Sequence, residues 1–518
     1  MIGERNILAL AFATSVFVCA VMPARAEEIT TNGTGGGRWS DATSWKGGKV
    51  PSAADEVVVR KFDVISVAGE CSCKKLQVDP KGVVQFQSGG AAALIVGDGI
   101  ENFGVIKADA TRSPRDKFEI RLLGETPDKR QCKLGKGAGL LLYGHKSITE
   151  PNVRLVAVVS PGEKDKEPVP GLVEVDGPAA IDWHRIAVVD VKLVAKKIDN
   201  TGAKTVERMN LLDCRFSGLA RVQCHTCDTP IIARNRFDYD GPAALAEPAI
   251  NVLYSPLCEI KENAIRGKFA MGISVNFQSD SSILENKIEG CAIGINGGYG
   301  IPSTMIKGCA IRGCETGIKL EGANGVIEQT TIDGAASPLK FENSTLQLTH
   351  VIAQPPAAAD AKVLSLNGGE VSLLNCGLRP EQAVLQAPAN NPAQPTAVIT
   401  WQYVVVGAKA PAGAVAEVRT IDPAPAANAA DLNVRFSPAV VVEGKTARPD
   451  RGNAIVVKSW SLDAKGPVKP APGYEVRILG PAAEGVQRPV LKAIPFRPAP
   501  EAFRGKLDDD TPTLEVDL

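Results

Sequence analysis

The chain has 518 residues, with 58 Lys and Arg against 58 Asp and Glu, so its formal net charge at pH 7 is zero. This balance excludes the strongly basic surface typical of nucleic-acid binding, and we expect no nucleic-acid partner. Fifty glycines, 36 prolines and only 5% aromatic residues favour turn-rich β structure over helices. The length predicts two or three units, or one long solenoid with appendages.

The first 26 residues have the features of a secretory signal peptide. Arg5 precedes an apolar run from Ile7 to Val21, and Ala24-Arg25-Ala26 is a small-residue cleavage pattern. The apolar run has about 15 residues, whereas a membrane span needs roughly 20. The sequence therefore predicts cleavage and a secreted, periplasmic or cell-surface protein whose mature chain has no membrane span.

The cysteines argue against a full disulfide framework. Twelve are present, and removal of Cys19 with the signal peptide leaves eleven, an odd number. The stretch Cys224-His225-Thr226-Cys227 has the spacing of a zinc or redox motif, but no second cysteine pair with ligand-like spacing lies nearby. We therefore predict no metal site.

A short pattern recurs between residues 214 and 378, as in "NKIEGCAIGI" (286–295) and "CAIRGCETGI" (309–318). Each repeat has an anchor residue two positions before an apolar partner, and successive anchors are 20 to 28 residues apart, about 23 on average. This period indicates a solenoid, and the β-branched, glycine-punctuated units predict two or three short strands each. The anchors are Cys214, Asn235, Asn263, Asn286, Cys309, Thr330, His350 and Cys376, and the partners are Phe216, Phe237, Ile265, Ile288, Ile311, Ile332, Ile352 and Leu378.

Units of this kind coil into a parallel β-helix whose rungs lie about 4.8 Å apart. Strand alternation points both the anchor and its partner inward. We therefore predict that Asn235, Asn263 and Asn286 form a structural ladder, and that His350 is a core histidine rather than a catalytic one. Cys291 and Cys314 would lie about 5 Å apart on adjacent rungs, where a disulfide and stacked free thiols are equally consistent.

The repeats over approximately residues 180 to 380 resemble the right-handed parallel β-helix family of the pectate-lyase-like superfamily. The resemblance predicts the fold but no active site. The paired-aspartate and Gly-His-Gly signatures of β-helix polygalacturonases are absent. In "IDWH" (181–184) the letters of a pectate-lyase motif are scrambled, so neither Asp182 nor His184 inherits a role from it.

Residues 37 to about 150 resemble the G-eight domain, a glycine-rich extracellular β module. Fibrocystin-like receptors and vertebrate hyaluronan-binding and hyaluronan-degrading surface proteins contain this module, so the resemblance implies extracellular glycan contact without transferring an active site. Ala54 departs from the family pattern, which often has glycine there. We expect Trp39 and Trp45 to plug the open end of the β-helix rather than stack on a sugar. The matching residues are Trp39, Ser40, Trp45, Gly47, Gly48, Pro51, Asp55, Val57, Leu123-Gly124-Glu125-Thr126-Pro127 and Leu141-Leu142-Tyr143-Gly144.

Together these features predict an all-β chain: a right-handed parallel β-helix solenoid with an N-terminal glycine-rich β module and a small C-terminal β-sandwich. The expected divisions are a signal peptide (1–26), a G-eight-like module (27–160), the parallel β-helix (161–385), a linker (386–396), the β-sandwich (397–480) and an extended tail (481–518).

Two candidate binding surfaces follow from the repeat. Positions one and three residues after each anchor point outward and include Arg236, Arg266, Lys287 and Arg312, interleaved with acids such as Asp238. They form either a face for an extended polyanion or a solvated face of paired charges. The 28-residue repeat contributes a loop with Asp238, Asp240 and Tyr254, where acids could protonate a glycosidic oxygen or hold Ca²⁺ and the tyrosine could stack on a sugar. An ordinary turn is the alternative for this loop.

Three functions are compatible with the sequence. The first is a secreted carbohydrate-binding β-helix that contacts an extended extracellular polysaccharide. The second is a polysaccharide lyase or hydrolase acting on an acidic polymer, with no cofactor other than Ca²⁺ in the case of a lyase. The third is a non-catalytic structural or adhesive surface protein. The lack of catalytic signatures argues against the second function, and the lack of a membrane anchor argues against the third.

Overall fold

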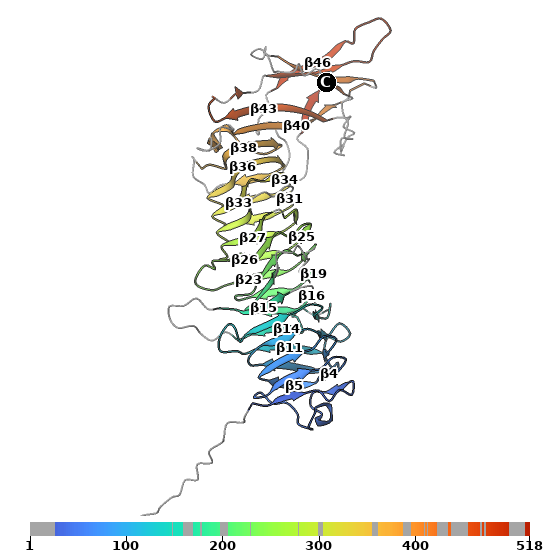
Figure 1. Ribbon diagram of the computed structural model, residues 1–518. Helices are drawn as coiled ribbons and strands as arrows, with labels where there is room; N and C mark the ends of the chain where they lie inside the picture. Colours follow the sequence, from blue (N-terminus) through green and yellow to red (C-terminus); the bar gives the residue numbers. More distant parts are fainter. Residues whose placement is uncertain are drawn as a thin grey trace, which may run out of the picture.

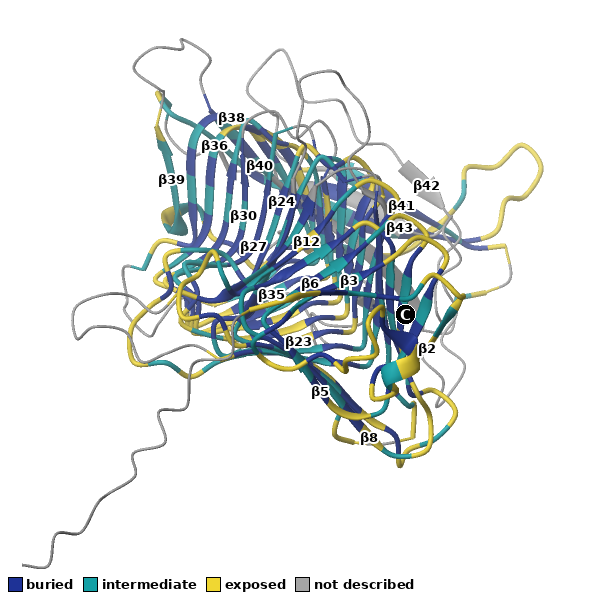
Figure 2. Cartoon of the chain, turned by 60° about the horizontal axis from the view of Figure 1, so that its bottom comes forward, coloured by how far each residue is buried: buried dark blue, intermediate teal, exposed yellow. Residues whose placement is uncertain are grey.

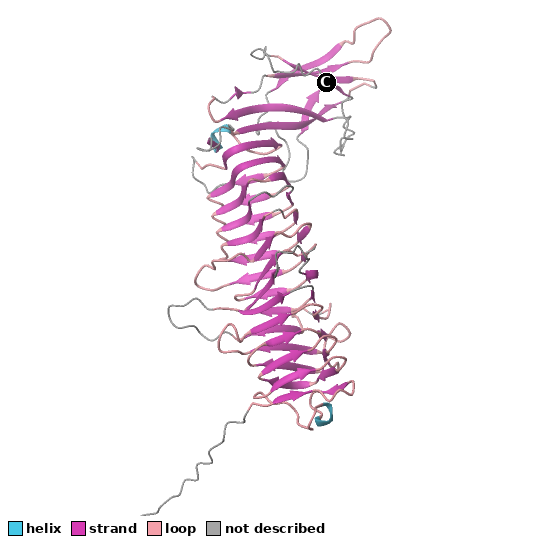
Figure 3. Ribbon diagram, in the orientation of Figure 1, coloured by secondary structure: helices cyan, strands magenta, loops and turns pink. Residues whose placement is uncertain are grey.

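The computed structural model of the protein is a long rod of stacked β-strands (Figure 1). Figure 3 shows strand and loop along almost all of its length, and the short helices of the described residues are η1 (Ala42–Ser44) and η2 (Pro380–Gln382). The chain is therefore all-β, as its composition predicts. The structure describes residues 26–147, 149–158, 169–176, 179–196, 206–227, 229–277, 279–298, 304–354, 361–386, 395–408, 410–411, 413–421, 434–436, 454–466, 469–470, 473–496 and 513–518.

Each coil of the rod contains three short strands, and equivalent strands of successive coils pair in parallel. We name the three resulting stacks the first ladder, the second ladder and the third sheet, in the order in which the chain visits them. The first and second ladders belong to one sheet of 31 strands, and the third sheet has 12 strands.

The first ladder contains β1 (Glu28–Thr30), β3 (Glu56–Val59), β6 (Lys75–Val78), β9 (Ile100–Asn102), β12 (Gln131–Leu134), β15 (Gly171–Asp176), β18 (Val191–Lys196), β21 (Arg221–His225), β24 (Ile250–Leu253), β27 (Met271–Asn276), β30 (Ile293–Gly298) and β33 (Thr316–Glu321). The second ladder contains β2 (Gly36–Arg38), β4 (Val64–Val67), β7 (Val83–Phe86), β10 (Val105–Asp109), β13 (Gly139–Tyr143), β16 (Ala179–His184), β19 (Val206–Leu212), β22 (Ile231–Ala233), β25 (Cys258–Lys261), β28 (Ser281–Leu284), β31 (Thr304–Lys307) and β34 (Asn324–Glu328). The third sheet contains β5 (Gly69–Cys73), β8 (Ala91–Val96), β11 (Lys117–Leu122), β14 (Val153–Ala157), β17 (Ala187–Val189), β20 (Arg215–Ser217), β23 (Arg236–Tyr239), β26 (Ala264–Gly267), β29 (Lys287–Glu289), β32 (Ala310–Arg312), β35 (Thr331–Asp333) and β37 (Ile352–Gln354). The long strands β36 (Ser337–Thr349) and β38 (Leu364–Leu374) span the first and second ladders, which continue in β39 (Ala383–Gln386) and β40 (Thr396–Ala408) respectively.

The ladders extend from the first described strands to the end of the rod. β1 pairs with β3 and β2 pairs with β4, so the coils begin near residue 28. Further along, β12 pairs with β15 and β14 pairs with β17, on either side of residue 160. The strands between residues 27 and 160 are therefore coils of the same rod, and the boundary expected at residue 160 falls between paired strands.

The N-terminal tryptophans are buried at the first coil. Trp45 Nε1 donates to the Trp39 carbonyl at 2.8 Å, and the two rings meet edge-on with centroids 5.3 Å apart. Each residue is only 2% exposed. Neither ring is open to a sugar, as expected for a plug in the end of the rod.

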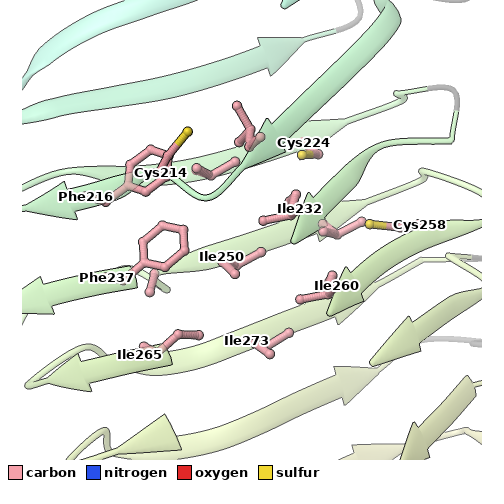
Figure 4. Close-up of a cluster of buried hydrophobic side chains, with 14 of the residues drawn as sticks. Cys214, Phe216, Cys224, Ile232, Phe237, Ile250, Cys258, Ile260, Ile265 and Ile273 are labelled. Atoms are coloured by element: carbon pink, nitrogen blue, oxygen red, sulfur yellow. The ribbon is translucent and has the colours of Figure 1, made fainter. Parts of the chain in front are cut away.

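Side chains alternate between the interior and the solvent along each strand, and the inward residues of successive coils stack (Figure 2). Figure 4 shows Phe216 beside Phe237, and these rings are nearly parallel with centroids 4.4 Å apart. Ile250 and Ile273 follow the same arrangement on the first ladder. The period of about 23 residues in the sequence is therefore one coil of this apolar interior.

The predicted asparagine ladder is confirmed. Asn235 Oδ1 accepts the backbone N–H of Cys214 at 2.9 Å, Asn263 Oδ1 accepts that of Asn235 at 2.9 Å, and Asn286 Oδ1 accepts that of Asn263 at 3.0 Å. Each of the three Nδ2 atoms donates to a backbone carbonyl of the preceding coil at 2.8 to 2.9 Å. These buried amides therefore satisfy both the backbone and one another.

The position predicted for His350 in this inward column is wrong by one residue. Pairing of Thr331 with Ile352 aligns Val351, which is buried, with the preceding anchors. His350 lies in the turn before it with a φ of 53°, and its Nε2 atom hydrogen-bonds Asn375 Nδ2 at 3.0 Å. Burial lowers the pKa of His350. The histidine is thus a half-buried turn residue, not an inward core residue.

The cysteines of the described chain are buried free thiols. Burial raises the pKa of Cys132, Cys214 and Cys376 to about 12, so these thiols stay protonated at neutral pH. Cys291 and Cys314 hydrogen-bond each other, which raises the pKa of Cys291 and lowers that of Cys314. A disulfide between these two residues stays a prediction.

The C-terminal region replaces parallel pairing by antiparallel pairing. β40 pairs in parallel with β38 and antiparallel with β43 (Ala454–Asp463), which in turn pairs with β44 (Lys469–Pro470). A separate four-stranded antiparallel sheet contains β42 (Val434–Phe436), β41 (Val415–Thr420), β45 (Tyr474–Leu479) and β46 (Val490–Phe496) in this order. Within the region expected to be a tail, β46 pairs with β45, and β47 (Thr513–Asp517) pairs with β40. Most of the predicted linker, residues 387–394, lies outside the described residues.

Candidate functional site

The outer face of the third sheet carries two columns of side chains in register. The first, the basic column, has Arg or Lys on four coils separated by alanines, and between Arg154 and Lys287 it contains no acid. The second, the alternating column, changes sign from coil to coil. The basic column is Arg154, Ala187, Arg215, Arg236, Ala264 and Lys287. The alternating column is Asp238, Arg266, Glu289, Arg312 and Asp333.

Some of these charges are paired. Arg236 Nε contacts Asp238 on the same strand, and Arg266 Nε lies 3.8 Å from Glu289 Oε2 on the next coil. Within the part of the chain that the structure describes, the predicted residues Lys287 and Arg312 form no ion pair. The face is therefore partly self-neutralised, and two of its predicted cations remain available to a ligand.

A hollow of about 410 Å³, here called the charged hollow, lies over β23, β26, β29 and β32. It brings together five of the predicted binding residues and has four cations against two carboxylates. Its charged lining residues are Arg236, Arg266, Lys287, Arg312, Asp238 and Glu289.

A second hollow of about 800 Å³, the neutral hollow, lies on the same sheet over β5, β8, β11 and β14. Its floor is formed by small residues, including Gly69, Ala91 and Ala93. Three cations (Lys117, Arg121, Arg154) face three carboxylates (Glu70, Glu119, Glu150) around it. Between the hollows, the outward positions of β17 and β20 include Ala187, Val189 and Ser217. Arg215 also points outward on β20 and pairs with Glu150 at 2.8 Å. We call the outer face of the third sheet from β5 to β32, which carries both hollows, the trough.

The structure does not bring Tyr254 and Asp240 into the charged hollow. Tyr254 follows β24 in the turn between the first and second ladders, where its ring stacks on Phe277 at 4.8 Å. Asp240 is exposed in the loop directly after β23. The single loop predicted to unite Asp238, Asp240 and Tyr254 is therefore divided between two sides of the rod, because the loop continues into β24 of the next coil.

The sequence did not predict a polar cluster that lies on the second ladder. Asp182 Oδ2 accepts a hydrogen bond from Tyr143 Oη at 2.8 Å, and Asp182 Oδ1 lies 2.8 Å from His184 Nε2 and 3.3 Å from Asn210 Nδ2. Burial opposes ionisation of Asp182, but these hydrogen bonds outweigh it and lower its pKa. Because a carboxylate only accepts, the N–H of this contact belongs to His184 Nε2, and Nδ1 is the ring nitrogen left out of it. The His184 side chain is 27% exposed and its ring meets that of Tyr143 edge-on.

Register explains the cluster. Alternation along β16 places Asp182 and His184 on the same outer face, and pairing with β13 and β19 brings Tyr143 and Asn210 beside them. Tyr143 and Asp182 are 39 positions apart in the sequence. The Asp-x-His spacing within a strand was the available signal, and it was set aside because the motif order did not match a known family.

Comparison with known proteins supports the fold through a family model. Residues 220–353 match the model described as a right handed beta helix region. No curated protein sequence matches the chain. Among solved structures, the chain is similar to the periplasmic alginate epimerase AlgG, with 15% identity, a TM-score of 0.41, and coverage of 60% of this chain and 76% of that one. One mutant of AlgG gives 15% identity, a TM-score of 0.36 and the same coverage, and another gives 13% identity, a TM-score of 0.34, and coverage of 66% and 75%.

Two features are missing from the described residues. None of the helices there is long and apolar enough to cross a membrane. The same residues contain no cluster of three or more His, Cys, Asp or Glu that could hold a metal ion.

Proposed function

We propose that the protein is an exported carbohydrate-binding β-helix that holds an extended acidic polysaccharide along the trough of the third sheet. The observation that carries this proposal is the excess of cations in the charged hollow, where Lys287 and Arg312 face solvent without an ion pair among the described residues. Carboxylates or sulfates of a polymer would complete the charge pairing that the protein leaves open.

The shape of the trough supports a polymer rather than a single sugar. The basic column has cations on four of six successive rungs, and Arg215 and Arg236 lie on adjacent rungs about 4.8 Å apart, so an extended chain can meet them without bending. The predicted signal peptide and the resemblance of residues 37 to 150 to the G-eight domain both point to extracellular or periplasmic glycans. The export and the G-eight assignment are parts of this proposal.

Retention on immobilised polymers tests the proposal. The purified mature protein would be passed over hyaluronan, pectate, alginate and chondroitin, with and without Ca²⁺, and retention measured at rising salt. We expect retention that weakens with salt, because exposed charge pairs are screened. The Lys287→Ala/Arg312→Ala variant should bind about tenfold more weakly, equivalent to about 1.4 kcal/mol. Lys492→Ala on β46 is the matched control. No retention on any of these polymers would instead favour a structural or adhesive spacer.

We also propose a second candidate, a lyase acting on an acidic polymer, because Asp182, His184 and Tyr143 form an oriented acid–base cluster. His184 Nδ1 would accept the proton from the ring carbon next to a carboxylate, and Asp182 would stabilise the imidazolium. The C–H electron pair would form the ring double bond, the neighbouring glycosidic C–O bond would break, and water would protonate the departing oxygen.

Absorbance of unsaturated products separates the two candidates. His184→Gln should lower product formation at least about a hundredfold, the usual effect of losing a general base, while leaving retention unchanged. His145→Ala, a histidine in the turn after β13, is the control. Retention without any product would contradict the lyase candidate. Product formation by the His184→Gln variant at the parent rate would show that His184 is not the base.

A further inference from the structure

A second surface of the rod, on the first ladder, has a different chemical character from the trough. Four successive coils, those of β21, β24, β27 and β30, carry two outward columns on this ladder that contain no Asp, Glu, Lys or Arg. Arg221, at the start of β21, precedes both columns. The first column is Gln223, Asn251, Ser274 and Asn296, and the second is His225, Leu253, Asn276 and Gly298. We call the five amide and hydroxyl residues Gln223, Asn251, Ser274, Asn276 and Asn296 the amide face. Ser274 is only 2% exposed, and its hydroxyl bonds the Asn276 and Asn296 amides, so the four amides are the groups open to a ligand. Figure 2 shows β24, β27 and β30 side by side.

Charged residues bound the amide face at both ends. Below it, Glu247 contacts Lys192 at 2.6 Å and Arg221 at 2.7 Å. Above it, the next coils continue the same columns with Lys319 and Glu321 on β33, and then with Lys340 and Glu342. On these four coils the two columns of the first ladder thus lack Asp, Glu, Lys and Arg, a local property of this face in a chain with 22% charged residues.

The amides of this face are not a structural ladder. In the interior, Asn235, Asn263 and Asn286 bond the neighbouring coil at 2.9 to 3.1 Å through every side-chain oxygen. On the amide face, Asn276 donates to Ser274 Oγ at 2.8 Å and Asn296 approaches the same atom at 3.5 Å. Gln223 and Asn251 make no side-chain hydrogen bond to any other described residue. Their donors and acceptors are thus left for solvent or a ligand.

Aromatic side chains line one edge of the face. Tyr254 stacks on Phe277 with centroids 4.8 Å apart and an interplanar angle of 10°, and its ring lies 5.4 Å from that of His225. Tyr254 is 44% exposed, so its edge and hydroxyl are open to a ligand. On the upper coil, Gly298 lies close against Asn276: a Cβ built there would lie 3.2 Å from Asn276 Oδ1, so a side chain at this position would displace that amide.

From this arrangement we propose that the amide face is a binding site for an uncharged saccharide, separate from the trough. Amides both donate and accept, which suits hydroxyl groups, and a surface of Asn, Ser and Tyr gives adaptable hydrogen bonds beside a rigid ring. The absence of charge on these four coils disfavours an acidic sugar, whose carboxylate would lose water without gaining a cation. This site does not depend on the function proposed for the trough.

Calorimetric titration with cellohexaose, maltohexaose and mannohexaose tests the site. We expect binding of at least one of these neutral hexasaccharides with an affinity that does not change with salt. The Asn251→Ala/Asn276→Ala variant should weaken it at least about tenfold, and Gly298→Val, whose side chain would displace the Asn276 amide, should also weaken it. Ser365→Ala, an outward residue of the same column on β38, is the matched control and should bind as the parent protein does.

Three results would overturn the proposal: no binding of any of the three hexasaccharides, binding that disappears in salt, or unchanged binding by the double variant. Thermal melting of each variant confirms that the rod is intact. Testing each double variant with the ligand of the other site distinguishes the trough from the amide face. Lys287→Ala/Arg312→Ala should leave hexasaccharide binding unchanged, and Asn251→Ala/Asn276→Ala should leave retention on the acidic polymers unchanged.

Discussion

The inward and outward sides of the same strands use their residues differently. On β23 and β29, Phe237 and Ile288 point into the rod and are at most 1% exposed, whereas Arg236 and Lys287 point outward. Inside, each residue finds its partner on the adjacent coil, as the Asn235 to Asn286 ladder illustrates. Outside, pairing is incomplete and differs from face to face. The interior therefore carries stability, and recognition depends on what each outer face leaves unpaired.

Truncation of an inward ring should give the largest effect. Phe237→Ala removes a side chain stacked on Phe216 and leaves a cavity, so we expect a loss of about 3–5 kcal/mol in the free energy of unfolding. Arg236→Ala, the outward neighbour on the same strand, should change it by less than about 0.5 kcal/mol. Urea unfolding followed by circular dichroism measures both. Similar losses for the two variants would break the distinction between the two sides.

An inward amide should matter more than an outward one. Asn263→Ala leaves the backbone N–H of Asn235 buried without its acceptor, at an expected loss of about 1–3 kcal/mol. Asn251→Ala on the amide face should fall within about 0.5 kcal/mol of the parent protein, because no described residue bonds to that side chain. The same unfolding assay compares them, and an equal loss would mean that Asn251 is a structural residue.

Asp182 sharpens the comparison because it points outward but is only 4% exposed. Its lowered pKa means that the ionised form stabilises the fold above the unfolded pKa of about 3.9, and that this contribution is lost as pH falls through the folded pKa. Asp182→Asn should therefore melt lower than the parent protein at neutral pH, and the difference should shrink in acid. Melting temperatures across this range measure the effect. A constant difference would show that ionisation of Asp182 does not contribute.

The outward ion pairs should give the smallest effect. A double-mutant cycle on Arg266→Ala and Glu289→Ala should yield a coupling of about 0.2–1 kcal/mol that disappears in high salt. Unfolding of the parent protein and the three variants provides the cycle. A larger, salt-resistant coupling would make the alternating column a structural element instead of a solvated face.

Sequence reasoning predicted the repeats best where one coil has a nearly constant length. Between Asn263 and Thr330 the anchors are 21 to 23 residues apart, and the inward positions were identified correctly there. At His350 the assignment was wrong by one residue, because the polar His350 stands two positions before the apolar Ile352, whereas the residues aligned with the other repeats are Val351 and Ala353. The first coils were assigned to a separate module because residues 37 to about 150 resemble the G-eight domain, and in the structure β1 to β14 pair in the same ladders as the later strands.

The candidate site was only partly predictable for a related reason. The charges of the charged hollow occupy fixed positions after each anchor, so strand alternation alone places them together. Tyr143, Asp182 and Asn210 meet only through the register of three coils, and irregular spacing concealed that register. Tyr254 shares a repeat with Asp238 but lies on another side of the rod. The sequence gives the order in which the chain visits the three sides of the rod. It does not give the exact length of each coil, which decides which residues of successive coils are aligned.

The antiparallel pairing of β40 with β43 has a consequence for self-association. A parallel β-helix presents unpaired N–H and C=O groups on its last coil, and a second molecule could add its own coil to such an edge. Here β43 and β47 occupy the two sides of β40 beyond β38, so the strand direction changes before the chain ends. A chain that ended at β38 would expose a long strand ready for end-to-end growth into fibres. The C-terminal strands thus cover the coil edge at β38 to which a second molecule could add.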